Sequence, residues 1–193
     1  MSKQKIITIA GKVGSGKSSS AKAVAKMLNY RHFSSGDLFR EIASKQQMDL
    51  LAANHHAEKN SDADHQVDSR LREIGRTDTE VVIDSRTAWH WIPGSFKVYL
   101  TLDTLVAAQR IIDNIKHRGS SANEKIPTDV GEYAKLLDAR YISENKRYMS
   151  LYQIDPAILT NYNLVIDTGK YDLTEVVDII YRAYQEWLDK NEP

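Results

Sequence analysis

One glycine-rich stretch near the start of the chain decides the fold, and it reads Gly11-Lys12-Val13-Gly14-Ser15-Gly16-Lys17-Ser18. It fits the pattern G-x-x-x-x-G-K-[ST], in which backbone N–H groups surround a nucleotide phosphate. The β-branched run Ile6–Ala10 before it is typical of a buried parallel strand, and Lys17–Leu28 after it has apolar residues at helical spacing. The N-terminus of that helix is expected to point at the phosphates. The sequence therefore predicts a nucleoside-triphosphate site.

The composition of the chain narrows the possible classes of function. Its 193 residues suit one domain, with small insertions, around a sizeable core. Lys and Arg together number 26 and so do Asp and Glu, so the net charge is zero, which argues against a general nucleic-acid binder. Cysteine is absent, which excludes disulfides and thiolate metal sites. Without a membrane-spanning apolar run or a signal-peptide pattern, we expect a cytoplasmic protein with no membrane partner, and we expect a monomer.

Strand and helix patterns alternate along the rest of the chain. Buried strands are predicted after the first one, at residues 31–34, 81–84, 96–101 and 164–167. Helices are predicted between and after them, at residues 35–47, 104–116, 129–152 and 173–189. Ser35 is the expected N-cap of the first of these helices, and the polar stretch 49–76 is expected to form two helices outside the central core. This order predicts an α/β fold: a five-stranded parallel sheet flanked by helices, with the ligand at the carboxyl ends of the strands.

A carboxylate at the end of one predicted strand suggests a magnesium site. Proteins with this phosphate loop place such a residue, here Asp84, where it holds Mg²⁺ directly or through water. Ser18, the last residue of the loop, would supply a second oxygen. The alternative is that Asp84 caps a helix or pairs with a cation in a loop.

Arginines recur where a sheet of this kind brings residues to one edge. Arg40 lies in the first turns of a helix that follows a strand, and Arg86 comes two residues after Asp84. Arg140 and Arg147 share one helical face, with Glu144 between them, and the preceding helix places Arg110, Asn114 and Arg118 along one side. Guanidinium groups bind phosphate through paired hydrogen bonds, and phosphoryl transfer needs positioning and charge neutralisation. Ordinary solvated helix faces are the alternative, but together with the loop the arginines favour a lid over a transferring phosphoryl group.

Four further motifs resemble one kinase family. Ser34–Glu41 resembles the S-[SAT]-G-[DE]-x-[FY]-R-E signature of small cytidylate kinases, and Asp84-Ser85-Arg86 resembles their [DE]-G-R. Arg140–Asp155 is similar to their R-x6-R-Y…Y-G-I-D, and Tyr162–Thr168 to their Y-D-L-V-I-[DN]-T. The match covers nearly the whole chain in order. The chain therefore resembles the short, archaeal-type cytidylate kinases among the nucleoside monophosphate kinases.

The resemblance implies a P-loop kinase domain over residues 1–193 that uses ATP and Mg²⁺ and takes small nucleotides as partners. Residues 35–76 would form the monophosphate-binding subdomain, and residues 118–128 the lid. The implied catalytic residues are Lys17, Arg118, Arg140 and Arg147. The implied ATP-binding residues are Gly11, Lys12, Val13, Gly14, Ser15, Gly16, Lys17, Ser18, Ser19, Arg110, Thr168 and Lys170. The implied monophosphate-binding residues are Ser35, Gly36, Asp37, Arg40, Asp68 and Arg86, and the metal would lie on Ser18 and, through water, on Asp84.

The sequence departs from the family pattern at three positions. Ser85 and Gln153 stand where glycine is usual, and Asn114 stands where a second lid arginine is often found, a role that Arg118 could take. Recognition of the acceptor base is assigned by residue chemistry alone: Asp64, Asp68 and Arg70 offer the acceptors and donors that cytosine needs, although one charged helix face would explain them equally well.

Several alternatives remain beside phosphoryl transfer to CMP or dCMP. Another acceptor, such as AMP or UMP, is possible because the Ser-x-Gly-Asp-x-x-Arg pattern also resembles adenylate kinases. A module that binds ATP without turnover is a second alternative. A GTPase is disfavoured because the chain has no N-K-x-D tetrapeptide, and a motor ATPase because Ser85 stands where glutamate usually follows the strand-end aspartate.

Overall fold

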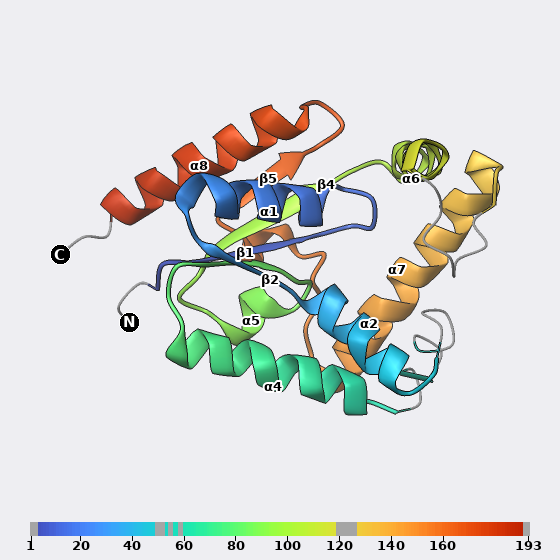
Figure 1. The fold of residues 1–193 in the computed structure, drawn as a ribbon, viewed down its shortest axis with the longest axis horizontal. Helices are drawn as coiled ribbons and strands as arrows, with labels where there is room; N and C mark the ends of the chain where they lie inside the picture. The colour runs from blue at the N-terminus through green and yellow to red at the C-terminus, as the bar shows by residue number, and fades with distance from the viewer. Residues whose placement is uncertain (1–3, 49–52, 54–55, 58–59, 119–126, 191–193) are drawn as a thin grey trace.

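The computed structural model describes residues 4–48, 53, 56–57, 60–118 and 127–190 (Figure 1). Its sheet has five parallel strands: β1 (Ile6–Gly11), β2 (Arg31–Ser34), β3 (Val81–Asp84), β4 (Phe96–Thr101) and β5 (Leu164–Asp167). They lie in the order β2-β3-β1-β4-β5. Because β2 and β3 lie on one side of β1 while β4 and β5 lie on the other, a crevice opens at the carboxyl end of β1, where ligands bind in sheets of this type.

Helices cover both faces of the sheet and its carboxyl edge (Figure 1). One face carries α1 (Lys17–Leu28) and α8 (Leu173–Asp189), and the opposite face carries α4 (Asp62–Thr77) and the short α5 (Ala88–Trp91). Beyond the carboxyl ends of the strands lie α2 (Ser35–Lys45), α6 (Thr104–Arg118) and α7 (Val130–Tyr152), and a 3₁₀ turn, η1 (Leu159–Asn161), precedes β5. Among the described helices, none is long and apolar enough to cross a membrane.

The hydrophobic core has two layers because successive residues of each strand face opposite sides of the sheet. Ile7 and Ile9 of β1 pack in one cluster with residues of α1 and α8, whereas Ile6 packs in the other cluster with α4 and α5. Thr8, between Ile7 and Ile9 in β1, is also buried. Its hydroxyl lies 3.1 Å from the Ser95 hydroxyl and so has a hydrogen-bond partner. Burial on both faces explains why the strands are nearly continuous apolar runs.

The predicted strands and sheet class are confirmed, and two local predictions are wrong. The N-cap of α2 is Ser34, not Ser35: its backbone is extended, and its hydroxyl accepts a hydrogen bond from the Asp37 N–H at 3.2 Å. The polar stretch is not wholly outside the core, because Val67, Leu71 and Ile74 of α4 are buried under the sheet. Three apolar residues spaced by four and three are enough to form one buried helical stripe. The helix expected before residue 60 lies largely outside the described residues.

Candidate active site

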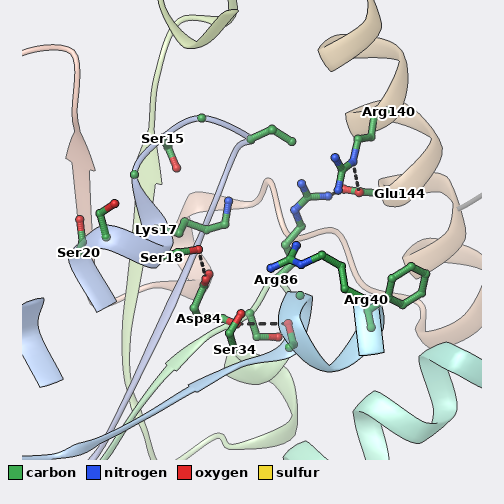
Figure 2. A pocket seen from close by; sticks show the side chains of 18 of the residues that line it. Ser15, Lys17, Ser18, Ser20, Ser34, Arg40, Asp84, Arg86, Arg140 and Glu144 are labelled. Carbon is green, nitrogen blue, oxygen red and sulfur yellow. Dashed lines mark hydrogen bonds and ion pairs between the residues drawn. The ribbon is translucent and has the colours of Figure 1, made fainter. Parts of the chain in front are cut away.

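A cavity of about 1310 Å³ lies at the carboxyl edge of the sheet. The residues that line it come from the glycine-rich loop, α1, α2, α4, the segment after β3, α6, α7 and the segment after β5. Elements far apart in the sequence therefore contribute to one space. Figure 2 shows Lys17, Arg40, Arg86 and Arg140 directed into it from four of these elements.

The glycine-rich loop can fold as it does because two of its positions exclude side chains. Gly11 has φ of 146°, and a Cβ there would lie 2.2 Å from the Leu100 carbonyl oxygen of β4. Gly14 has φ of 76°, and a Cβ would lie 2.8 Å from that of Ala107 on α6. Within the loop, the Ser15 hydroxyl donates to the Lys12 carbonyl at 2.8 Å. The backbone of the loop thus approaches both neighbouring elements and leaves its inner side open to the cavity.

Lys17 is the first residue of α1 and lies at the floor of the cavity, where its pKa is strongly lowered. Its ammonium donates a hydrogen bond to the Lys12 carbonyl at 2.7 Å. Burial, reinforced by Arg86 and Arg140 and opposed by Asp84, lowers the pKa of Lys17 from 10.5 to about 7. These surroundings disfavour the charged form of Lys17. An anion bound beside it would therefore strongly stabilise the ammonium.

The oxygens of Ser18 and Asp84 are in contact at the carboxyl end of β3. The Ser18 hydroxyl donates to the Asp84 carboxylate, and the Ser35 hydroxyl donates to the Asp84 carbonyl at 3.2 Å. One hydroxyl and one carboxylate form the hard-oxygen pair that suits Mg²⁺ with water completing its coordination. These residues therefore fit the metal that the sequence predicts.

Two of the arginines share one buried carboxylate. Arg86, after β3, forms an ion pair with Glu144 of α7, and the Arg140 Nε donates to the same carboxylate at 2.9 Å. Glu144 is only 5% exposed. The carboxylate holds two guanidinium groups side by side against their mutual repulsion, and Figure 2 shows this group facing Lys17 across the cavity.

The predicted residues of α2 occupy the wall opposite α7. Ser35, Gly36 and Arg40 line the cavity. Arg40 is half-exposed and forms an ion pair with Asp37, which is not among the described lining residues. Because this ion pair is exposed to water, the Arg40 guanidinium can exchange Asp37 for another partner at small cost.

Arg147 and Asp68 lie deeper, between α7 and α4. The Arg147 Nε is 2.9 Å from Asp64, and both side chains are almost fully buried. Asp68, one helical turn after Asp64, is 4% exposed and accepts a hydrogen bond from the Trp91 indole at 2.8 Å. Burial raises the pKa of Asp68, and hydrogen bonds from Tyr152 and Trp91 oppose that rise. Both predicted residues line the cavity, but in this arrangement Arg147 also ties α7 to α4.

A second group of lining residues stands beside the glycine-rich loop. The Arg110 guanidinium donates to the Thr168 carbonyl at 2.8 Å, and the Thr168 hydroxyl donates to the Thr101 carbonyl at 3.1 Å. Lys170 points to solvent, 3.7 Å from Asp167, and is absent from the described lining. The side chain of Arg118 and most of the expected lid lie outside the described residues.

The structure brings most of the predicted site residues to one cavity. Those that line it are Val13, Gly14, Ser15, Gly16, Lys17, Ser18, Ser19, Ser35, Gly36, Arg40, Asp68, Asp84, Arg86, Arg110, Arg140, Arg147 and Thr168. Gly11, Lys12, Asp37 and Lys170 do not belong to the described lining. Sequence reasoning did not assign a site role to Glu144 or Tyr148, which also line it. Glu144 could have been found, since it lies four residues after Arg140 on the same helical face.

Comparison with known proteins identifies the family. Residues 6–170 match the sequence model of the Cytidylate kinase-like family. The chain belongs to this family. Among its relatives, the cytidylate kinase of Thermoplasma volcanium is 36% identical over 95% of this chain and 93% of its own length. The cytidylate kinase of Methanocaldococcus jannaschii is also 36% identical, over 92% of this chain and 96% of its own length.

Solved structures with the same fold include other small kinases. A shikimate kinase from Bacteroides thetaiotaomicron superposes with a TM-score of 0.62 at 15% identity, covering 95% of this chain and 98% of that one. A gluconokinase from Sinorhizobium meliloti gives a TM-score of 0.57 at 16% identity, covering 99% of this chain and 100% of that one. At such identities the likeness establishes the P-loop kinase fold alone.

The structure shows the local setting of two departures from the cytidylate kinase-like pattern. Gln153 is the C-cap of α7 with φ of 59°, a left-handed conformation in which glycine carries no penalty. Ser85 is buried, and its hydroxyl accepts hydrogen bonds from the N–H groups of Thr87 and Ala88, both at 3.3 Å, at the start of α5. Asn114 lines the cavity one turn after Arg110, and nothing in the structure explains why asparagine stands there.

Proposed function

We propose that the protein transfers the γ-phosphoryl group of ATP to CMP or dCMP. One observation carries the proposal: Lys17 of the glycine-rich loop faces Arg40, Arg86 and Arg140 from three other elements across one cavity. Phosphoryl transfer requires little covalent chemistry from the protein, and such converging cations supply the charge neutralisation it needs. Membership of the cytidylate kinase-like family supports the nucleotide acceptor.

In the proposed reaction an oxygen of the acceptor phosphate attacks the γ-phosphorus while the bond to the β–γ bridging oxygen breaks. ADP leaves with that electron pair, and the acceptor becomes a diphosphate. Lys17 binds the β- and γ-phosphates, and the backbone N–H groups of the loop bind the β-phosphate. Arg86 and Arg140, already held together by Glu144, neutralise the transferring group. Arg110 and Thr168 contribute to the wall for the ATP base.

Ser18 and Asp84 are the proposed magnesium ligands, Asp84 through water. Mg²⁺, when bound, neutralises charge on the β- and γ-phosphates and aligns them for in-line transfer. The contact between the two side chains keeps these oxygens at the carboxyl end of β3, beside Lys17. Their places in β3 and α1 fix both donors on rigid elements rather than on a free loop.

Arg40 is the proposed ligand of the acceptor phosphate, and residues 35–76 are the proposed acceptor-binding region. Arg147 is the remaining proposed catalytic arginine, and its pairing with Asp64 joins this region to α7. Lys170, exposed on the surface, is the least supported of the predicted ATP ligands.

The test is ADP formation from ATP and Mg²⁺ with CMP, dCMP, UMP, AMP, GMP or no acceptor. We expect turnover that depends on CMP or dCMP, and none with Lys17→Ala, whose fold is checked by circular dichroism. Arg40→Ala should raise the KM for CMP far more than the KM for ATP. Lys45→Ala, on the same helix but in a solvent-exposed ion pair, is the matched control. ATP binding without turnover for any acceptor would overturn the proposal.

A further inference from the structure

Three basic side chains gather around α5, apart from the cavity. Arg72 belongs to α4, His90 to α5 and Lys97 to β4, and none of the three is part of the described cavity lining. Burial lowers the pKa of His90, and the charges of Arg72 and Lys97 lower it further. The three groups are therefore close enough to act on one another, and we call them the basic cluster.

The basic cluster is poorly balanced by carboxylates. None of its three side chains forms an ion pair within the part of the chain that the structure describes, whereas Arg70, two residues before Arg72, is paired with Glu73. Asp68 is the carboxylate that acts on His90, and it opposes the fall in the His90 pKa. It is buried and already accepts the Trp91 indole N–H at 2.8 Å. The cluster therefore keeps an excess of positive charge.

The Trp91 ring holds two members of the basic cluster in place. The Arg72 guanidinium lies over this ring, 3.9 Å from its centroid, and the His90 ring meets it edge to face at 4.4 Å. The Tyr152 ring packs against it from a further side at 5.2 Å. A guanidinium that stacks through its flat face keeps the N–H groups along its edge available to a ligand. Arg72 is exposed, so these donors can be reached from solvent.

Lys97 adds an ammonium group that is only half-exposed. It lies on β4 beside Thr8 of β1, and its side chain is on the same face of the sheet as Tyr99, which packs with Trp89 of α5. Burial lowers the pKa of Lys97. A partly buried ammonium without a carboxylate is stabilised by an anion bound beside it.

The donors of the basic cluster match the oxygens of linked phosphate groups. A guanidinium binds phosphate through paired hydrogen bonds, an imidazole offers a ring N–H, and an ammonium offers three donors. Three such groups on three elements offer more donors than a single phosphate uses. We propose that Arg72, His90 and Lys97 form a second phosphate-binding site, separate from the cavity, that takes a small molecule with a di- or triphosphate chain. This inference goes beyond the proposed function and does not depend on it.

The test is a titration of the full-length chain with pyrophosphate, followed by NMR signals of the His90 ring and the Trp91 indole N–H. It is made in the wild-type protein and again in Lys17→Met, in which the cavity is expected to bind the probe weakly. We expect saturable shifts of both signals in both proteins. Arg72→Gln and Lys97→Gln should each weaken this binding about tenfold, because each removes a charged donor. Arg70→Gln, on the same helix but in an exposed ion pair, is the matched control and should leave the affinity unchanged.

The outcomes separate this site from the cavity and from the proposed reaction. If the shifts disappear in Lys17→Met, or if Arg72→Gln and Lys97→Gln fold normally and keep the wild-type affinity, the second site is overturned. Inorganic phosphate and CTP are titrated in the same way: CTP should bind at least as tightly as pyrophosphate, and equal affinity for inorganic phosphate would overturn the di- or triphosphate assignment. Melting temperatures identify an unstable variant, and the two variants lie on different elements. A protein that shows these shifts but phosphorylates no monophosphate would overturn the proposed function alone.

Discussion

Raising the pH should weaken nucleotide binding through a single side chain, Lys17. Burial beside Arg86 holds its pKa at about 7 in the nucleotide-free protein. Phosphates bound next to it stabilise the charged form, so binding takes up a proton whenever Lys17 is neutral beforehand. Above this pKa the amine of the free protein is neutral and must take up a proton when ATP binds, which weakens binding. Below it the amine is already charged, so binding takes up no proton. At pH 8 about nine in ten free molecules carry neutral Lys17, so about 0.9 proton should be taken up per ATP bound.

Isothermal titration calorimetry in buffers of different ionisation enthalpy measures that proton uptake directly. ATP is titrated in the presence of EDTA, so that metal hydroxides do not contribute. Above pH 8 the apparent Kd should rise about tenfold per pH unit, which corresponds to about 1.4 kcal/mol. Lys17→Met, the control, should bind ATP more weakly at every pH and take up no proton. A pH-independent Kd or an absence of proton uptake at pH 8 would refute the reasoning.

Three further predictions concern stability. Gln153→Gly should stabilise the protein by about 1 kcal/mol, because it removes a side chain from a left-handed cap, and should raise the Tm by about 2–4 °C; an unchanged or lower Tm would contradict this. Ser85→Gly should lower the free energy of unfolding in urea by about 1–2 kcal/mol, since two buried N–H groups lose their acceptor; a neutral result would show that water replaces it. Asp64→Ala should lower the free energy of unfolding by about 3–5 kcal/mol, because the Arg147 charge would remain buried without its carboxylate. Asp178→Ala, in an exposed pair with Arg182, should cost less than about 1 kcal/mol, and equal losses would count against the argument.

The sheet was predictable because its determinants are local. Each strand is a short apolar run, and the glycine-rich loop places β1 at the centre of a known topology. The same logic brought Asp84, Arg86 and Arg40 to one edge, because parallel strands all end there. Most of the residues that the sequence motifs singled out therefore line the cavity.

Contacts between side chains were not predictable in the same way. Ser34 and Ser35 are both good caps, and only the extended backbone of Ser34 decides between them. The pairing of Arg86 with Glu144 joins residues of two elements whose relative placement the sequence does not specify. The Trp91–Asp68 hydrogen bond likewise joins α5 to α4, two elements whose packing the sequence does not specify.

The position of the two α5 tryptophans also gives the protein an intrinsic fluorescence signal for binding in the cavity. The chain has 3 tryptophans, and Trp187 lies on α8, on the other face of the sheet. The Trp91 indole donates to the Asp68 carboxylate and the Trp89 indole to the Arg86 carbonyl, so both tryptophans lie directly behind residues that line the cavity. A ligand that arrives there changes the electric field on these indoles and shifts their emission, while Trp187 provides a steady background. Binding of the proposed acceptor should therefore be measurable without a label, by stopped-flow fluorescence of the unmodified chain.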